Sequence, residues 1–219
     1  GLIVAYPAQD RAANPSLCWN WFDRKDQQRG SGEPAKIAGL TQELIAEFGI
    51  DRDHVFVAGL SAGGAMAAIL AATYSDLYAA VGIHSGLPVA SASDLISALA
   101  AMRGERAAPR PAPMIHTRVR TIVFHGDADQ TVHPSNGERI VDATKSEWNE
   151  KGEETLTARS PGGSCYRRTI VRNTAGLPVL EHWTVQGMGH AWSGGSPAGS
   201  YTDTRGPDAS REMVRFFLE

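Results

Sequence analysis

The feature that most constrains this chain is a strand, a tight turn and a helix between residues 54 and 74. Residues 55–58 form an apolar run that predicts a buried strand, and the Ala-rich residues 65–74, with no Gly or Pro among them, predict a buried helix. Between them, residues 59–63 read Gly-Leu-Ser-Ala-Gly, the pattern G-x-S-x-G of a nucleophile elbow. A Gly-Ser turn before a helix is common, but the flanking strand and helix favour the functional interpretation. We therefore expect the Ser61 hydroxyl at a helix N-terminus, where backbone N–H groups stabilise an anion.

Composition excludes several classes of protein. The chain has 219 residues, 42% of them hydrophobic, which is enough for one sizeable core, and we expect a single domain over residues 1–219. The formal net charge is −3 and the basic residues are scattered outside residues 103–110, so a nucleic-acid partner is disfavoured. No apolar run approaches the roughly 20 residues that span a bilayer. No histidine and carboxylate spacing suggests zinc, and we expect no metal and no cofactor.

Predicted strands and helices alternate along the chain. Further strands are predicted at residues 2–7, 79–86 and 120–126, a strand pair at 167–171 and 179–185, and helices at 33–48, 136–148 and 209–218. This alternation implies a mostly parallel sheet with helices on both faces. Because a natural domain seldom begins inside its core, the apolar run at residues 2–7 also leads us to expect further sequence before Gly1.

Two segments and two cysteines allow alternative interpretations. Residues 18–22 (CWNWF) form an aromatic cluster that is either a packed loop or a wall of a substrate cleft. Residues 88–113 are poor in large apolar side chains, with one short predicted helix at 94–102, and form either a cap over the site or a surface excursion. Cys18 and Cys165 fit one disulfide of an exported protein or two free thiols.

A serine nucleophile needs a base, and the base needs an orienting acid. In an α/β-hydrolase the three residues follow in the order Ser, acid, His, each beyond a strand end. The loop after the strand at 120–126 contains Asp127 and Asp129, and the loop after the strand at 179–185 contains His190. Both partners therefore occur where this topology requires them, which favours an α/β-hydrolase fold.

The sequence contains seven histidines, of which His190 alone combines a loop of small residues with the right place in the chain order. His84 follows a predicted strand and is expected to line the cleft near Ser61. His125 resembles a structural turn residue and His182 lies within a predicted strand. The other three show no matching chemistry: His54, His116 and His133.

Several motifs together resemble the polyhydroxybutyrate depolymerase and feruloyl esterase family of secreted α/β-hydrolases. They are residues 59–66 (GLSAGGAM), 125–132 (HGDADQTV), 187–195 (GMGHAWSGG), 18–22 (CWNWF) and 206–210 (GPDAS). The resemblance implies that Ser61 is the nucleophile, Asp129 rather than Asp127 the acid, and His190 the base. It also implies an extracellular location, in which we expect a Cys18–Cys165 disulfide.

The resemblance also implies an oxyanion hole that this sequence contains only in part. Ala62 N–H is expected to be one donor. In the family, a His-Gly loop upstream of the strand at residues 2–7 gives the second donor, so we expect that donor, and the N-terminal strands of the fold, before Gly1.

Together these features predict a serine carboxylic-ester hydrolase that works through an acyl-enzyme. The resemblance implies feruloyl, acetyl-xylan or hydroxyalkanoate esters, either small or polymeric, as substrates. The expected substrate-binding residues are Trp19, Trp21, Trp192 and His84. A serine peptidase of the same fold and a non-catalytic polymer-binding relic remain alternatives. The sequence does not indicate an oligomeric state.

Overall fold

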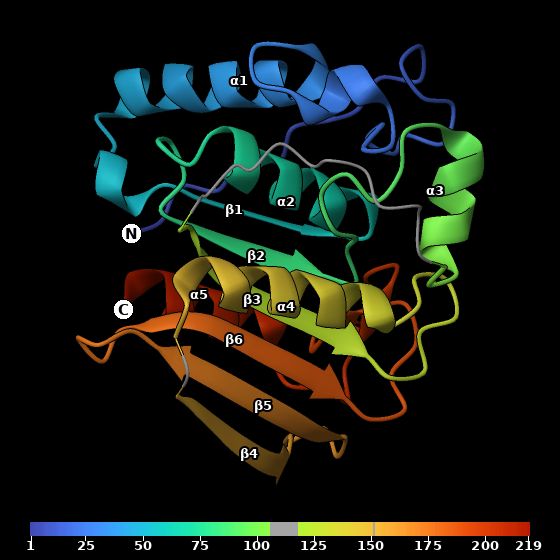
Figure 1. Cartoon of the computed structure of the whole chain (residues 1–219), viewed down its shortest axis with the longest axis vertical. Coiled ribbons are helices and arrows are strands. Elements are labelled where there is room, and N and C mark those ends of the chain that lie inside the picture. Colours follow the sequence, from blue (N-terminus) through green and yellow to red (C-terminus); the bar gives the residue numbers. More distant parts are fainter. Residues whose placement is uncertain (106–117, 151) are drawn as a thin grey trace.

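The computed structural model describes residues 1–105, 118–150 and 152–219. Its centre is a six-stranded sheet in the order β1-β2-β3-β6-β5-β4 (Figure 1). The first four of these strands pair in parallel, and β5 pairs antiparallel with both of its neighbours, β6 and β4. In sheet order their bounds are β1 Phe56–Leu60, β2 Ala80–His84, β3 Arg120–Gly126, β6 Pro178–Val185, β5 Cys165–Arg172 and β4 Glu153–Arg159.

Helices cover both faces of the sheet. Helices α2 and α4 pack on one face, with α1 beyond α2, and α5 packs on the other face (Figure 1). Their bounds are α1 Gly32–Phe48, α2 Ala62–Thr73, α3 Leu95–Met102, α4 Ser135–Trp148 and α5 Ala209–Leu218. Short 3₁₀ turns lie at Arg24–Gln27 and Arg52–His54, and a small parallel pair joins β7 Trp192–Ser193 to β8 Thr202–Asp203. The mostly parallel sheet between two helical layers confirms the predicted α/β-hydrolase fold.

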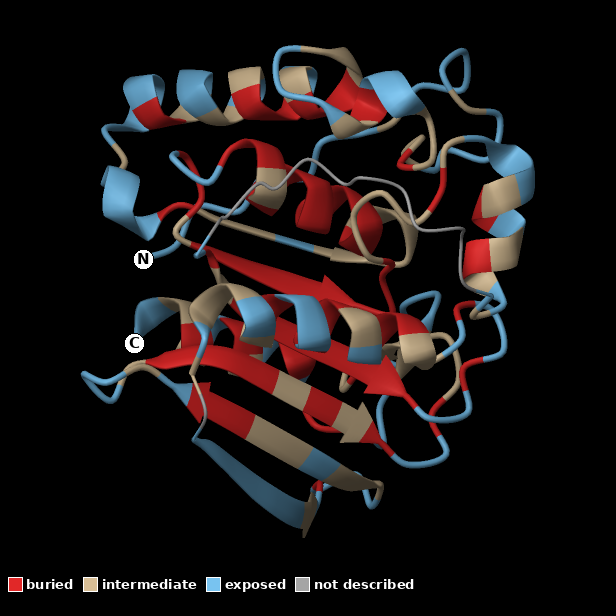
Figure 2. Cartoon of the chain, viewed as in Figure 1, coloured by how far each residue is buried: buried red, intermediate tan, exposed pale blue. Residues whose placement is uncertain are grey.

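The central strands are buried on both faces, as a parallel sheet under two helical layers requires. Successive side chains of a strand point to opposite faces, so each strand supplies two cores. Val81, Ile83 and Val123 pack in the core on the side of α2 and α4, whereas Ile122 and Phe124 pack in the core that contains α5. Figure 2 shows this burial in β2 and β3 and its loss at β4.

Strand β4 is the strand of the six-stranded sheet that the sequence pattern missed. Its seven residues, EETLTAR, are almost all exposed, yet every one of them pairs with β5. Because β4 lies at the edge of the sheet, its backbone ladder holds it without an apolar face, and no period-2 pattern marks it.

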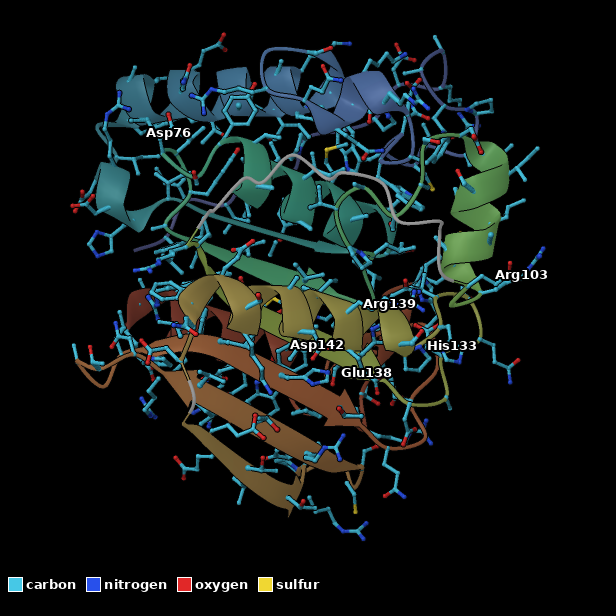
Figure 3. All side chains as sticks on the ribbon, viewed as in Figure 1. Asp76, Arg103, His133, Glu138, Arg139 and Asp142 are labelled. Atoms are coloured by element: carbon cyan, nitrogen blue, oxygen red, sulfur yellow. The ribbon has the colours of Figure 1, made fainter. Side chains whose placement is uncertain are left out.

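Helix α3 is attached to the start of α4 (Figure 3). His133 N–H donates to Met102 O at 2.8 Å, and the Arg139 guanidinium donates to Gly104 O. Asn136 Nδ2 adds a bond of 2.9 Å to Ala101 O. The position of α3 in the chain agrees with the helix predicted at residues 94–102. Residues 106–113 lie outside the described residues. Whether residues 88–113 form a cap over the site or a surface excursion therefore stays a prediction.

A buried ionic network ties β5, β6 and α5 together. The Glu181 carboxylate is fully buried and accepts bonds of 3.0 and 2.6 Å from Arg168 and of 2.8 Å from Arg215 to each of its oxygens. Trp183 Nε1 donates a further bond of 2.9 Å. Burial raises the pKa of Glu181, but the two guanidinium groups outweigh burial and hold it below its ordinary value.

We expect Glu181→Gln to lower the free energy of unfolding by about 3–5 kcal/mol, because Arg168 loses the carboxylate it pairs with and Arg215 keeps only its pairs with Glu212 and Glu219. Since the pKa of Glu181 is lowered by folding, this stabilisation is present above the ordinary Glu pKa and is lost as the pH falls through the lowered value. Urea unfolding at pH 7 and pH 3 measures both effects. Glu154→Gln, on the exposed strand β4, is the matched control. A change below 0.5 kcal/mol at pH 7, roughly that of an ordinary surface substitution, would contradict the network's importance.

The predicted buried strand at residues 2–7 is wrong. This segment is irregular, and Leu2, Val4 and Tyr6 are 55%, 64% and 89% exposed. A strand is held by the backbone ladder to a neighbour. In the described structure residues 2–7 pair with no strand, so their apolar side chains have no surface to cover.

The predicted Cys18–Cys165 disulfide is also wrong, because both cysteines are free thiols. Cys18 lies in the loop before α1, and helix α1 packs beyond α2 on the β1 side of the sheet. Cys165 begins β5, which is four strands away from β1. Strands lie about 4.8 Å apart, and a disulfide needs Cα atoms within about 7 Å. The sheet therefore separates the two thiols.

Among the described helices, none has both the length and the apolar character needed to cross a membrane.

Candidate active site

Ser61 occupies a strained turn between β1 and α2. Its φ of 58° and ψ of −120° lie in a region that non-glycine residues rarely adopt. Ser61 N–H donates to His84 O at 2.9 Å, and Ser61 O accepts from Ala65 N–H at 2.9 Å. These two bonds hold the turn that the G-x-S-x-G pattern predicted.

The glycines around Ser61 have unequal roles. A Cβ on Gly59 would lie 2.3 Å from the backbone of Gly63, so Gly59 cannot carry a side chain. A Cβ on Gly63 would meet open space, whereas one on Gly64 would lie 3.0 Å from the carbonyl oxygens of Gly59 and His84. The close approach is therefore made by Gly59 and Gly64, together with the backbone of Gly63.

Ala62 is the first residue of the 12-residue helix α2. The N–H groups of the first helical turn have no acceptor within the helix, and the helix dipole is positive at this end. Ala62 therefore presents an N–H group beside Ser61, at the place where an oxyanion donor is expected.

Asp129 and His190 form the central hydrogen bond of the site. Asp129 lies in the loop after β3, is 3% exposed, and its Oδ2 accepts a bond of 2.8 Å from His190 Nδ1. Its Oδ1 accepts from the N–H groups of Thr131 and Val132, each at 2.9 Å. With Nδ1–H engaged by a carboxylate, the Nε2 atom of His190 is free to accept a proton.

The pKa of Asp129 lies below its ordinary value. Burial acts to raise this pKa, but the hydrogen bond from His190 and the backbone N–H groups of Val132 and Thr131 together outweigh burial. Asp129 is therefore ionised at neutral pH, as an acid that orients an imidazole must be.

Asp127 has a different contact. Asp127 is exposed, and its Oδ1 accepts a hydrogen bond of 2.6 Å from Gly187 N–H. Ala128 N–H also donates to Met188 O at 3.1 Å, so the loops that follow β3 and β6 are bonded to each other. Of the two candidate acids, Asp129 is the one in contact with His190.

Ser61, Asp129 and His190 all follow the carboxyl ends of parallel strands, which lie at one edge of the sheet. These strands are β1, β3 and β6, within the contiguous set β1-β2-β3-β6. No hydrogen bond joins the Ser61 hydroxyl to His190 in the described part of the chain. Without a substrate such bonds are often long.

Two of the expected substrate-binding residues are buried, and the prediction is wrong for both. Trp21 is 6% exposed and packs edge-on against Phe22 in the core that contains α1 and α2. His84 is fully buried between two aromatic rings. Neither side chain has a surface left for a ligand.

The other two are half-buried. Trp19 lines a surface hollow of about 550 Å³ beside α1, with Glu33 and Lys36, and none of the three residues Ser61, Asp129 and His190 lines it. Trp192 follows His190 and donates its indole N–H to Ser210 Oγ at 3.1 Å. Their contact with substrate stays a prediction. No group of three or more His, Cys, Asp or Glu able to hold a metal occurs in the described ranges.

The parallel sheet, the strained elbow and the acid–imidazole pair at its carboxyl edge define this chain as an α/β-hydrolase. Residues 1–148 match the model of the family described as esterase PHB depolymerase. The chain belongs to that family.

Named relatives agree with this assignment, and one solved structure agrees with the fold. The chain is 30% identical over 197 residues to poly(3-hydroxyalkanoate) depolymerase C of Paucimonas lemoignei, covering 85% of this chain and 47% of that protein. It is 25% identical over 236 residues to acetylxylan esterase A of Talaromyces purpureogenus, covering 93% and 58%. The acetyl xylan esterase structure from Aspergillus awamori has the same fold, with a TM-score of 0.70 at 21% identity over 92% of this chain and 73% of that one. The chain thus spans about half the length of the curated relatives.

Proposed function

We propose that this chain forms the catalytic part of a serine carboxylic-ester hydrolase, with Ser61 as nucleophile, His190 as base and Asp129 as orienting acid. The observation that carries the proposal is the 2.8 Å bond from His190 Nδ1 to Asp129, at the sheet edge that also presents the strained Ser61. Membership of a family of esterases supports ester rather than amide chemistry.

In the proposed reaction, His190 Nε2 takes the proton of Ser61 Oγ while Oγ bonds to the ester carbonyl carbon. Ala62 N–H stabilises the negative oxygen of the tetrahedral intermediate. The C–O bond to the alcohol then breaks and His190 returns the proton to the alcohol. Water, deprotonated by His190, attacks the acyl-enzyme and releases the acid with Ser61 restored. The second oxyanion donor stays a prediction.

We infer that the substrates are acetyl or 3-hydroxyalkanoate esters, because the relatives are named for acetylxylan and for poly(3-hydroxyalkanoate). Feruloyl esters follow from the family resemblance alone. An extracellular location is proposed on the same resemblance.

The full-length protein should hydrolyse p-nitrophenyl acetate and 3-hydroxybutyrate oligomers much faster than p-nitroanilides with the same acyl groups. Initial rates at equal concentration measure the ratio. A comparable or higher rate on the anilides would favour a peptidase. No turnover of either class, together with no covalent labelling of Ser61 by a fluorophosphonate, would favour a binding module.

A further inference from the structure

His84 is the last residue of β2, the strand between the nucleophile strand β1 and the acid strand β3. Its ring is fully buried and stacked, with the centroid 5.7 Å from that of Phe124 and 5.1 Å from that of Trp192. The proposed reaction does not use this ring, so its role must come from the groups that it contacts.

The hydrogen bonds of the His84 ring specify its protonation. Its Nε2 lies 3.0 Å from Ser193 N, and a backbone N–H can only donate, so Nε2 must be the unprotonated acceptor. The proton is then on Nδ1, which donates to Ser85 Oγ at 3.2 Å. A protonated imidazole would place two donors against each other at Ser193.

Electrostatics keep the ring in this neutral form. Burial lowers the pKa of His84 to about 3, and the imidazoles of His125 and His190 act in the same direction, against Asp129. The group is thus neutral throughout the pH range in which an imidazole base operates. It is a fixed acceptor rather than a second proton carrier.

One residue therefore touches both halves of the site. The His84 carbonyl accepts the Ser61 N–H at 2.9 Å, which holds the elbow. The His84 ring accepts a hydrogen bond from Ser193 N–H and stacks on Trp192. Trp192 and Ser193 lie two and three positions after His190 in the chain. On its other side, Ser193 Oγ donates to Pro207 O at 2.6 Å.

We propose that His84 is a positioning residue that fixes the separation between Ser61 and His190, by bonding the elbow through its carbonyl and the segment after His190 through its ring. This inference rests on the proposed function of Ser61 and His190. It replaces the expectation that His84 contacts substrate.

A matched pair of amide variants tests the ring's role in the full-length protein. In His84→Gln the amide oxygen reaches the place of Nε2 and can accept from Ser193, whereas in His84→Asn it is one methylene too short. We expect the Asn variant to lose about 100-fold in kcat on p-nitrophenyl acetate with KM within threefold, as for misplaced catalytic groups. The Gln variant should recover kcat to within about fivefold of the parent. His54→Gln, at an exposed site, is the control.

Urea unfolding of the same samples shows whether a variant loses kcat because it is less stably folded or although it is folded. Equal kcat in folded Gln and Asn variants would overturn the proposal, as would a folded Gln variant with 100-fold loss. If neither variant folds, ¹⁵N NMR of histidine-labelled parent protein decides. An Nδ1–H tautomer that does not titrate between pH 5 and 8 supports the proposal, and an Nε2–H tautomer overturns it. Should Ser61→Ala retain full activity, the proposed function itself fails, independently of His84.

Discussion

Ser61→Ala is expected to lower kcat for ester hydrolysis by about 10⁴- to 10⁶-fold, as removal of a serine nucleophile does in other hydrolases. Alanine has the same backbone constraints as serine at φ 58°, and the hydrogen bonds at Ser61 that hold the elbow are made by its backbone. The free energy of unfolding should therefore change little. Initial rates on p-nitrophenyl acetate and urea unfolding measure the two quantities.

Ser146→Ala is the matched control for Ser61→Ala, because Ser146 is exposed on α4, away from the carboxyl edge of the sheet. The control should keep parental rates. A Ser61→Ala variant that retains more than a few per cent of the parental rate would show that another group attacks the ester.

Asp129→Asn is expected to lower kcat by about 10⁴-fold through the tautomer of His190, as in the serine protease precedent. The N–H groups of Thr131 and Val132 both point at Oδ1, so the amide oxygen of an asparagine must occupy that place. Its NH₂ group then faces His190 Nδ1. Two donors cannot bond, so the imidazole moves its proton to Nε2 and can no longer accept the Ser61 proton.

The control for Asp129→Asn is Asp127→Asn, two residues away in the same loop. Asp127 contacts Gly187 N–H rather than His190, so its variant should lose less than about tenfold. Rates for the two variants at pH 7 and pH 8 give the comparison. Equal losses in both, or a larger loss for Asp127→Asn, would contradict the assignment of the acid.

Much of the fold was predictable because apolar periodicity marks buried elements. The predicted strand at 120–126 and helix at 209–218 coincide with β3 and α5, and the predicted helix at 33–48 ends, as α1 does, before Gly49, which has a left-handed conformation. The meeting of the acid loop with the His190 loop was predictable because strand ends of a parallel sheet share one edge, but the choice of Asp129 over Asp127 came from the family resemblance.

The predictions are wrong or incomplete where a segment's structure depends on contacts with distant parts of the chain and not on its own pattern of apolar residues. The apolar residues 2–7 look like a core strand, but a strand needs a neighbour that the described sheet does not offer them. Strand β4 is mostly polar and is held by its backbone ladder to β5 and by polar side-chain contacts of Glu153 and Thr155, not by an apolar face. Whether Cys18 and Cys165 can pair depends on the distance between them across the sheet, which their spacing in the sequence does not indicate.

Burial separated residues that looked alike in the sequence. Trp21 and Trp19 lie two positions apart in one aromatic loop, yet Trp21 is in the core and Trp19 lines a surface hollow. His84 resembles a residue of the cleft, but its ring is enclosed by Phe124 and Trp192, which come from distant parts of the chain. These contacts are tertiary, and no single segment contains them.

The central claim is that Ser61 and His190 act as one unit oriented by Asp129. The most direct measurement is mass spectrometry of the full-length protein after treatment with a fluorophosphonate, which reacts with activated serines. We predict a single adduct on the peptide that contains Ser61, formed at least 100-fold more slowly in the His190→Ala and Asp129→Asn variants, consistent with loss of an activating base. Labelling of Ser61 at an unchanged rate in both variants, or labelling of a different serine, would contradict the account.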